Sequence, residues 1–447
     1  MNTPLFVALL GVLGVVFLVI GKRASQGQKT REDYFLGGRS IGLFALTMTI
    51  LATQLGGGTI IGASEEAFQR GWTGLLYPMG MGLGLILMAL GFGASLRRRG
   101  LTTISEVFEK VYGSPRMRRI GALLSMVSLF LVLAGQGVAA RKFFFALGYD
   151  EIWLFLAFWL VIIGYTVMGG LRAVVYTDVV QGLIILAVFG ITFLACFMGA
   201  SEPAPVIQIV GNSQDIPWMG WLLMPMLFMM VGQDMGQRCF AGRSPRKVSL
   251  AFAFSAVLLV IATLFPIYLG DLARAQGIAV PAGASVVMST VQALTNPTIT
   301  ALFACAVLLA IISTADSLLN AVSSHLSFDF PALRRGGVIL PQSLTLVVGM
   351  SAMGLSYAFN NIIGLFVISY ELVICVTAVP VLMAILLKKP SRRGATVAMI
   401  CGACGFALFR VVPAPFSQEL LTLLIAFAGY GMGELLERRR TIADVSV

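Results

Sequence analysis

The sequence is poor in the residues that build catalytic and metal sites in soluble proteins. Its 447 residues include a single histidine, His325, and only 11% of them are charged. The six cysteines indicate no disulfide framework. Cys401 and Cys404 form a C-x-x-C in an apolar stretch without a second pair of ligands, so we expect them to pack. We find no nucleophile beside a base and no cluster of metal ligands, and therefore do not expect an enzyme.

Apolar residues are what the sequence has in excess. They make up 58% of the chain, and the mean hydropathy is +0.92, which lies outside the range of soluble globular domains. Apolar runs of about 18 to 25 residues recur along the chain, each long enough to cross about 30 Å of hydrocarbon as a helix. We predict an all-α membrane protein with about thirteen transmembrane helices, at 4–21, 40–68, 72–96, 117–142, 151–169, 172–199, 216–236, 248–270, 297–325, 337–358, 361–387, 394–411 and 417–436.

Basic residues predict the orientation of these spans, because Lys and Arg favour the cytoplasmic side of short loops. With the N-terminus outside, the inner loops hold 26 of the 31 Lys and Arg residues, Arg238 among them, and the outer loops hold the other five. The bias predicts an N-out, C-in topology. The net charge of +11 is scattered over seven inner segments, so we expect contact with membrane lipid and no nucleic-acid partner.

Two of the predicted spans are interrupted. The second reads TILATQLGGGTIIGASEEAF, and the seventh reads IPWMGWLLMPMLFMMVGQDMGQRCF. An interior glycine costs a helix about 1 kcal/mol relative to alanine, and unwound backbone at membrane depth needs protein or water around it. The breaks lie five spans apart, which predicts two inverted repeats, 40–199 and 216–387, flanked by 4–21 and 394–436 in one transporter domain, 1–447. Close helix packing through glycine is the alternative.

Polar residues recur at membrane depth in the ninth span. They follow the spacing i, i+3, i+4, i+7, i+11, which draws one stripe along a helix: Ser313, Asp316, Ser317, Asn320 and Ser324. Asp178 lies at depth in the sixth span. Ionisable groups inside a membrane indicate a functional pathway by default, and hydroxyl, carboxylate and carbonyl oxygens suit a hard cation such as sodium. The alternative is that the hydroxyls bond to their own helix.

Five motifs together resemble the sodium:solute symporter family over essentially the whole chain. DYFLGGRSIG precedes the second span, ATQLGGGTIIGASEEAF lies within it, and GGLRAVVYTDVVQG lies in the sixth. GQRCFAGRS follows the seventh span, and AIISTADSLLNAVSSHLSFDF lies in the ninth. The resemblance implies a LeuT-type fold of two inverted five-helix repeats, alternating access around a midplane site, and import of a small polar organic solute with sodium.

The resemblance also implies the ligands of the transported sodium ion. The principal site would consist of the carbonyls of Ala52, Leu55 and Ala310 and the hydroxyls of Ser313 and Thr314. Some family members have a second sodium position, which would correspond here to Asp178, Ser313, Asp316 and Ser317. Asp316 stands where several relatives have a hydroxyl, so this carboxylate could be a ligand or a structural group. The stoichiometry stays open.

The solute is less constrained. GGGTIIGASEEA and STADSLLNA look most like the high-affinity choline transporters, which hold a quaternary ammonium with tryptophans. Gln54 and Gly232 stand at the two tryptophan positions, so we do not transfer choline as the substrate. We expect solute contacts from the two breaks and the helices facing them: Gln54, Gly57, Gly58, Thr59, Gln136, Gln233, Asp234, Tyr370 and Glu371. Among these, Asp234 could pair an amine; helix packing is the alternative for each.

Two other functions fit parts of the sequence. A proton-coupled carrier of the same fold is the nearer alternative, because buried carboxylates can exchange protons. A solute sensor would need an attached signalling domain, and only ERRRTIADVSV follows the last predicted span. We expect a monomer in the cytoplasmic membrane of a bacterium.

Overall fold

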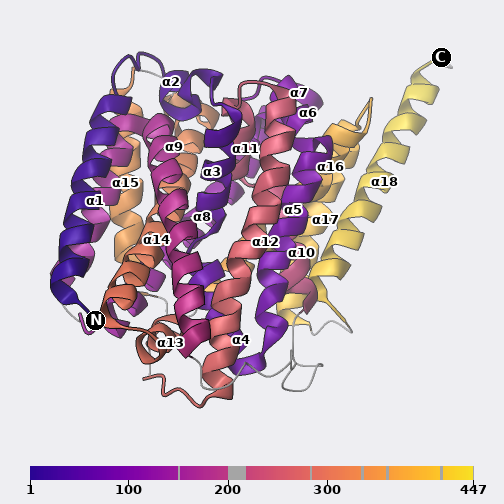
Figure 1. Cartoon of the computed structure of the whole chain (residues 1–447). Coiled ribbons are helices and arrows are strands. Elements are labelled where there is room, and N and C mark those ends of the chain that lie inside the picture. Colours follow the sequence, from indigo (N-terminus) through magenta and orange to yellow (C-terminus); the bar gives the residue numbers. More distant parts are fainter. Residues whose placement is uncertain are drawn as a thin grey trace.

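The computed structural model describes residues 1–149, 152–199, 218–281, 284–333, 337–358, 362–412 and 416–445. In these ranges the chain is an all-helical bundle whose long helices run roughly along one direction (Figure 1). The helices are α1 (Thr3–Ala24), α2 (Arg31–Leu36), α3 (Leu43–Gln54), α4 (Ala63–Arg70), α5 (Leu76–Leu87), α6 (Gly93–Arg98), α7 (Glu106–Tyr112), α8 (Pro115–Ala146), α9 (Ile152–Gly199), α10 (Trp218–Val231), α11 (Gln233–Ala241), α12 (Pro245–Ala275), α13 (Val286–Leu294), α14 (Pro297–Asp329), α15 (Ile339–Leu355), α16 (Ile362–Leu386), α17 (Arg392–Val411) and α18 (Gln418–Val445).

The described helices are those of a multi-pass membrane protein. Nine of them are long and apolar enough to cross a bilayer, and a tenth candidate is a pair bent by 57°, Leu43–Gln54 with Gly58–Arg70. Two shorter apolar helices, α10 and α15, lie in further predicted spans. Each of the thirteen predicted ranges therefore contains helix, whereas the number of crossings and their orientation stay predictions.

Helix α9 holds two of the predicted spans. Its 48 residues would extend about 72 Å if straight, more than twice the thickness of a bilayer core. At Gly170 the backbone adopts φ 52° and ψ −148°, and a Cβ there would lie 2.4 Å from the Tyr34 carbonyl oxygen. Only glycine fits this reversal. Tyr149, just before α9, stacks on Phe6, and Gly199 at its end lies against Leu294, so both ends are on the face opposite Tyr34.

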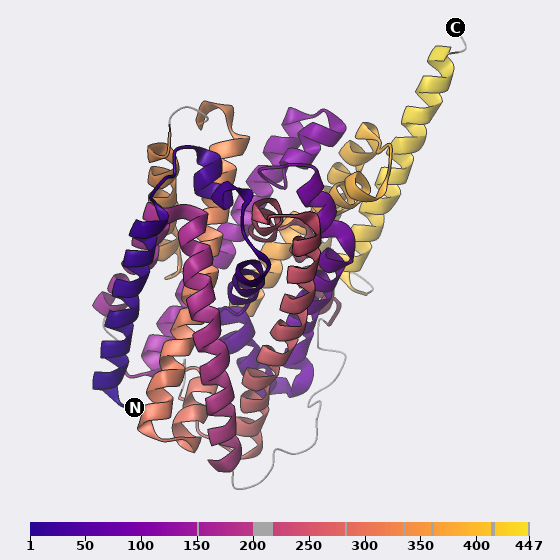
Figure 2. The same cartoon turned by 45° about the horizontal axis from the view of Figure 1, so that its top comes forward.

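The two chain ends lie on opposite faces of the bundle, as an odd number of crossings requires (Figures 1 and 2). The N-terminus shares its face with α4 and α13, and the C-terminus lies on the face that carries α2 and α7 (Figure 1). Which of these faces meets the cytoplasm stays a prediction.

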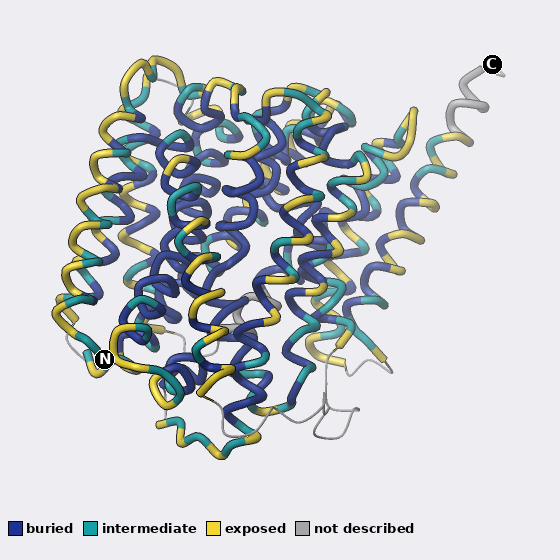
Figure 3. Tube along the Cα trace, viewed as in Figure 1, coloured by how far each residue is buried: buried dark blue, intermediate teal, exposed yellow. Residues whose placement is uncertain are grey.

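Burial separates a peripheral shell from a central helix. In the most apolar 18-residue stretch of α1, only 17% of the residues are buried. The exposed side chains of this helix are apolar, such as Val12 and Val15. Figure 3 shows exposed residues along the length of this helix. In α14 the corresponding share is 83%, and the whole predicted polar stripe is buried. Helix α14 is packed against α3, α8, α9 and α15, so its polar groups face protein and not lipid.

The last turn of α14 ends in a buried ionic cluster. Asp329 accepts hydrogen bonds from Arg118 Nε at 2.6 Å and from the Thr103 hydroxyl at 2.8 Å. His325 Nδ1 lies 2.6 Å from the other Asp329 oxygen, and its Nε2 lies 2.9 Å from the Ser125 hydroxyl. The single histidine thus has two partners in a cluster that joins α8 to α14.

Candidate functional site

The second predicted span is broken at its glycines. Helix α3 ends at Gln54, and after Gly56 and Gly57 the chain continues through a π-helical turn, Gly58–Gly62, into α4. A Cβ on Gly56 would lie 2.4 Å from Thr314 Oγ1, and one on Gly57 would lie 2.4 Å from the Ala139 Cβ. Glycine is needed here because the unwound backbone lies directly against α14 and α8.

The break brings backbone oxygens to the hydroxyls of α14. Ser313 Oγ lies 2.8 Å from the Ala52 carbonyl oxygen and 3.0 Å from that of Ala310. Thr314 Oγ1 lies 2.8 Å from the Thr53 carbonyl oxygen and 3.2 Å from that of Ala310. Four of the five residues in the predicted principal sodium site are therefore in mutual contact.

Leu55, the fifth predicted ligand, is the residue that caps α3, with non-helical backbone at φ −83° and ψ 62°. The α3 carbonyl that contacts Thr314 is that of Thr53, a residue outside the predicted principal site. Each hydroxyl lies near two carbonyl oxygens but has a single proton to donate. One of the two carbonyl oxygens near each hydroxyl is therefore available to another partner, such as a cation. Neutral oxygens at this spacing suit a cation of low charge such as sodium.

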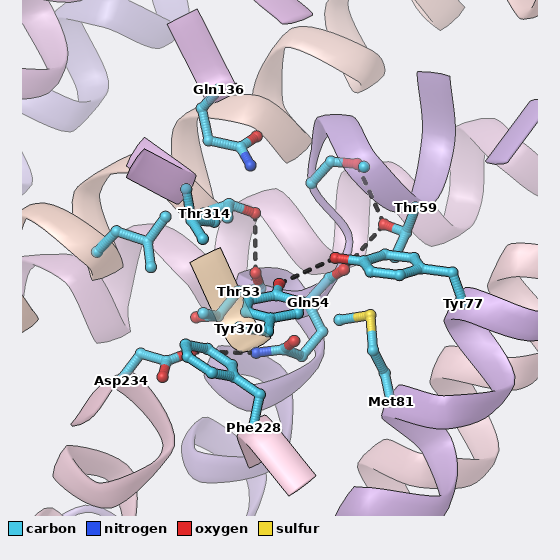
Figure 4. Close-up of a pocket in the computed structure, with 14 residues that line it drawn as sticks. Thr53, Gln54, Thr59, Tyr77, Met81, Gln136, Phe228, Asp234, Thr314 and Tyr370 are labelled. Atoms are coloured by element: carbon cyan, nitrogen blue, oxygen red, sulfur yellow. Dashed lines mark hydrogen bonds between the residues drawn. The ribbon is translucent and has the colours of Figure 1, made fainter. Parts of the chain in front are cut away.

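A small pocket lies beside this oxygen cluster (Figure 4). Its volume is about 20 Å³, room for about one water molecule, so a solute requires the lining side chains to move apart. The lining residues are Thr53, Gln54, Gly56, Gly58, Thr59, Tyr77, Met81, Val132, Gln136, Phe228, Asp234, Thr314, Leu318 and Tyr370. Thr53 and Thr314 belong to both the pocket lining and the oxygen cluster, so the two sites share residues.

Three aromatic rings and one carboxylate dominate the pocket. The Phe228 and Tyr370 rings stack with centroids 4.1 Å apart, and the Tyr77 and Tyr370 hydroxyls lie 2.9 Å apart. Asp234, in the first turn of α11, is only 3% exposed. Its Oδ2 accepts a long hydrogen bond of 3.4 Å from Gln54 Nε2 (Figure 4), and its Oδ1 has no hydrogen-bond partner in the described part of the chain. A buried carboxylate oxygen of this kind calls for a donor or a cation.

A second polar cluster surrounds Arg238, which is not itself in the pocket lining but contacts the lining residues Thr53 and Asp234. Arg238 lies in α11 with 0% of its surface exposed. Its Nη2 lies 2.5 Å from Ser317 Oγ, 2.6 Å from Thr53 Oγ1 and 3.3 Å from Thr49 Oγ1. The same nitrogen lies 3.7 Å from Asp178 Oδ2, to which the Thr49 hydroxyl donates at 2.5 Å. The prediction that Arg238 is a loop charge is wrong, because its side chain is buried within α11.

The other carboxylate of the stripe, Asp316, is one residue from Ser317. It accepts hydrogen bonds from the Tyr165 hydroxyl and, at 3.3 Å, from Ser317 Oγ. Three residues of the predicted second sodium position thus gather around one cluster: Asp178 and Ser317 contact Arg238, and Asp316 contacts Ser317. Ser313, the fourth, has its contacts with the carbonyls of the principal site.

Comparison with known proteins identifies the family. The sodium:solute symporter family matches residues 34–402, most of the chain. The chain belongs to the sodium:solute symporter family. Family members are transporters, which agrees with the expectation that the chain is not an enzyme. Relatives include the high-affinity choline transporter 1 of Homo sapiens, 28% identical over 450 residues that cover 92% of this chain and 75% of the relative. The corresponding transporter of Mus musculus is 27% identical over 470 residues, covering 95% and 78%.

Solved structures show that this symporter has the LeuT-type fold. A substrate-bound, outward-open sodium-coupled sialic acid symporter superposes with a TM-score of 0.78 at 19% identity, covering 97% of this chain and 98% of that one. A nucleobase-cation-symport-1 family transporter with a bound hydantoin superposes with a TM-score of 0.66 at 16% identity, covering 89% and 92%. At these identities the likeness establishes the fold alone.

The symporter's pocket contains six of the nine predicted solute-binding residues: Gln54, Gly58, Thr59, Gln136, Asp234 and Tyr370. Gly57 is adjacent, because its backbone N–H donates to Gln136 Oε1 at 2.9 Å. Gln233 and Glu371 are not in the lining. The Gln233 amide accepts from the Ile104 N–H at 2.8 Å and donates to Ser324 at 3.0 Å, while Glu371 pairs with Arg410 on α17.

Several pocket residues of this symporter escaped the sequence analysis. Tyr77, Met81, Val132, Phe228 and Leu318 lie in apolar helices where nothing distinguishes them from core residues. Phe228 carried a weak signal, since it precedes the break at Gly232 by one helical turn. Only some residues of a helix face a given neighbouring helix, and a single sequence does not show which residues these are.

Proposed function

We propose that this chain imports a small polar organic solute together with sodium by alternating access between the two sides of the membrane. Family membership supports sodium-coupled symport as the class of activity. One observation carries the proposal: the Ser313 and Thr314 hydroxyls of α14 meet the Ala52 and Thr53 carbonyls at the break of α3. We assign the sodium ligands to these oxygens, to the Ala310 carbonyl and to Leu55. We assign 40–199 and 216–387 as the inverted repeats.

Sodium and solute are coupled through shared residues in this proposal. A sodium ion among these oxygens ties α3 to α14, next to the unwound glycines. Gly56 and Thr314 also line the pocket, so the ion fixes part of the solute's binding surface before the solute arrives. Such coupling between two ligands is reciprocal and is typically worth about 1–3 kcal/mol. When sodium dissociates on the side of low sodium concentration, the affinity of the pocket for the solute then falls.

The pocket favours a solute that carries a positive charge. Asp234 offers a buried carboxylate oxygen without a hydrogen-bond partner among the described residues. The rings of Tyr77, Phe228 and Tyr370 lie around the same pocket and can hold a cation over their faces. The human and mouse relatives are choline transporters by name, which agrees with this chemistry. Because Gln54 and Gly232 replace two tryptophans, we propose an amine class and not choline itself.

A proton-coupled carrier is a second candidate function. Asp178 and Asp316 are both fully buried on neighbouring helices, α9 and α14, and carboxylates of that kind exchange protons in some carriers. The two candidates differ in the ion gradient that drives accumulation. Sodium-free buffer with an imposed pH gradient therefore separates them.

Uptake into proteoliposomes tests the proposal. The purified protein is reconstituted, and the accumulation of small primary, secondary and quaternary amines is compared with that of size-matched neutral amides. We expect an inward sodium gradient to drive accumulation of at least one amine, and a potassium gradient of equal size to drive none. Accumulation driven only by a pH gradient would refute sodium coupling, and accumulation of the neutral amides alone would refute the amine class.

The setting of the transporter follows from the same proposal. We propose that it works as a monomer, because the described chain contains both the oxygen cluster and the pocket. We also propose a cytoplasmic membrane of bacterial type, with the N-terminus outside. Crosslinking of the reconstituted protein and labelling of single cysteines from either side test these two assignments.

A further inference from the structure

The Arg238 side chain is a fully buried cation that the proposed transport mechanism does not use. It lies in α11, none of its surface is exposed, and it contacts residues of three predicted spans. A charged group inside a bilayer needs close partners and marks a functional position. Arg238 donates from Nη1 to the Asp234 carbonyl oxygen one turn earlier in its own helix, at 2.9 Å. That bond fixes one edge of the guanidinium, so the other edge is aimed at the neighbouring helices.

The groups around the free edge are the kinds of ligand that bind a metal cation. Three hydroxyl oxygens, of Thr49, Thr53 and Ser317, lie between 2.5 and 3.3 Å from Nη2. One carboxylate oxygen, of Asp178, lies at 3.7 Å. These four groups come from α3, α14 and α9, three separate helices. Hard oxygen ligands converging from several helices around one positive charge are the arrangement expected of a sodium site.

We propose that the Arg238 guanidinium is a tethered cation that occupies the second cation position of this transporter in place of a second sodium ion. Asp178 and Ser317, two residues of the predicted second sodium site, contact the same guanidinium nitrogen. A sodium ion among these oxygens would lie within a few ångströms of a fixed positive charge, and like charges repel strongly in a medium of low dielectric constant. The chain therefore binds one sodium ion, at Ser313 and Thr314.

The tethered cation performs the structural part of what a second ion would do. It links α11 to α3, α9 and α14 through one side chain. Unlike a transported ion it cannot dissociate, so it adds no dependence on sodium concentration. The statement about one sodium ion rests on the proposed sodium coupling, whereas the occupation of the second position by Arg238 does not.

Direct counting of bound sodium tests this inference without knowledge of the solute. Purified protein in detergent is titrated with radioactive ²²Na⁺, and the number of ions per chain at saturation is measured. We expect one ion for the wild type, with a Hill coefficient near 1. Arg238→Ala should bind one ion more than the wild type, because the vacated oxygens accept sodium. Arg238→Lys keeps a tethered charge and should bind no extra ion.

Two further variants make the result specific. Arg238→Ala combined with Asp178→Asn should lose the extra ion, since the carboxylate of the second position is gone. Arg243→Gln removes an exposed arginine two residues after α11 and should leave the count unchanged. Two ions on the wild type would overturn the inference, as would a monodisperse Arg238→Ala protein that gains none. If Arg238→Ala does not purify, Arg238→Gln replaces it.

The outcome also separates this inference from the proposed function. A wild type that binds no sodium would contradict sodium coupling. A gain of one ion in Arg238→Ala would support the tethered cation even then, because the comparison is between the two proteins and not with an absolute number.

Discussion

Replacing Ser313 with alanine tests the principal sodium site most directly. The Ser313 hydroxyl is one of the two side-chain groups in the site and lies 2.8 Å from the Ala52 carbonyl oxygen across the α3–α14 interface. The substitution removes one ligand oxygen and leaves the backbone carbonyls in place. A polar contact to a charged group is worth about 1.5–3 kcal/mol, which corresponds to a change in affinity of about 10- to 150-fold. We expect sodium affinity to fall within that range.

The same substitution should cost little global stability. The lost hydrogen bond between neutral groups contributes about 0.5–1.5 kcal/mol. Ser323→Ala is the matched control, because Ser323 is also buried in α14 but donates to Leu319 of its own helix, at 2.7 Å. It removes a comparable hydrogen bond without touching α3. Both variants should therefore unfold at similar temperatures, while only Ser313→Ala weakens sodium binding.

The assay is the rise in unfolding temperature of the purified protein with increasing sodium, with potassium replacing sodium to keep the ionic strength constant. The gain in stability at a sodium concentration c follows RT ln(1 + c/Kd), so fitting the rise to this relation gives the sodium dissociation constant. A fitted dissociation constant for Ser313→Ala within twofold of the wild type would refute the assignment of this hydroxyl as a ligand. A similar weakening in Ser323→Ala would also refute it, because the effect would then reflect general loosening of α14.

Three further predictions follow from other parts of the structure. Asp234→Asn should raise the KM for an amine solute about tenfold or more while sodium binding is retained, since a charged partner is worth about 1.5–3 kcal/mol; uptake and sodium titrations measure this. Asp329 pairs with Arg118 at 2.6 Å, and its carboxylate is fully buried. Asp329→Asn removes the negative charge of this pair and should destabilise the protein by up to about 3–5 kcal/mol, measured by thermal unfolding. Gly56→Ala should weaken sodium binding about tenfold or more, because its Cβ would lie 2.4 Å from a hydroxyl oxygen of α14, whereas Gly42→Ala meets open space and is the control.

The sequence carried most of the architecture because membrane helices have a strong one-dimensional signal. A run of apolar residues of bilayer length is unambiguous even in a single sequence. The break in the second span was also predictable, since three consecutive glycines disfavour a helix and the structure bends there by 57°. The reversal at Gly170 was predicted only as a boundary between two spans. Its cause, the approach of the Tyr34 backbone, is a tertiary contact that sequence does not reveal.

The contacts among the proposed sodium ligands were predictable for a different reason. Ser313 and Thr314 follow Ala310 at helical spacing, and the family motif supplied their partners on α3. The structure brings Ala52 to them as expected, but it adds Thr53, whose carbonyl lies 2.8 Å from Thr314. A motif names residues that act in relatives. The angle at which the unwound backbone meets α14 decides which carbonyl points inward, and that angle depends on packing.

Arg238 shows where a composition rule fails. The positive-inside rule treats every Lys and Arg near the end of a span as a loop charge in water. Arg238 follows Asp234 by four residues, so both lie on one face of α11, and this spacing was the available signal for an arginine held inside the protein. Its other partners, on α3, α9 and α14, are invisible in the sequence. Removing Arg238 from the count leaves 25 inner against five outer basic residues. The predicted orientation therefore does not depend on the misassigned residue, whereas the predicted second sodium site depends on it entirely.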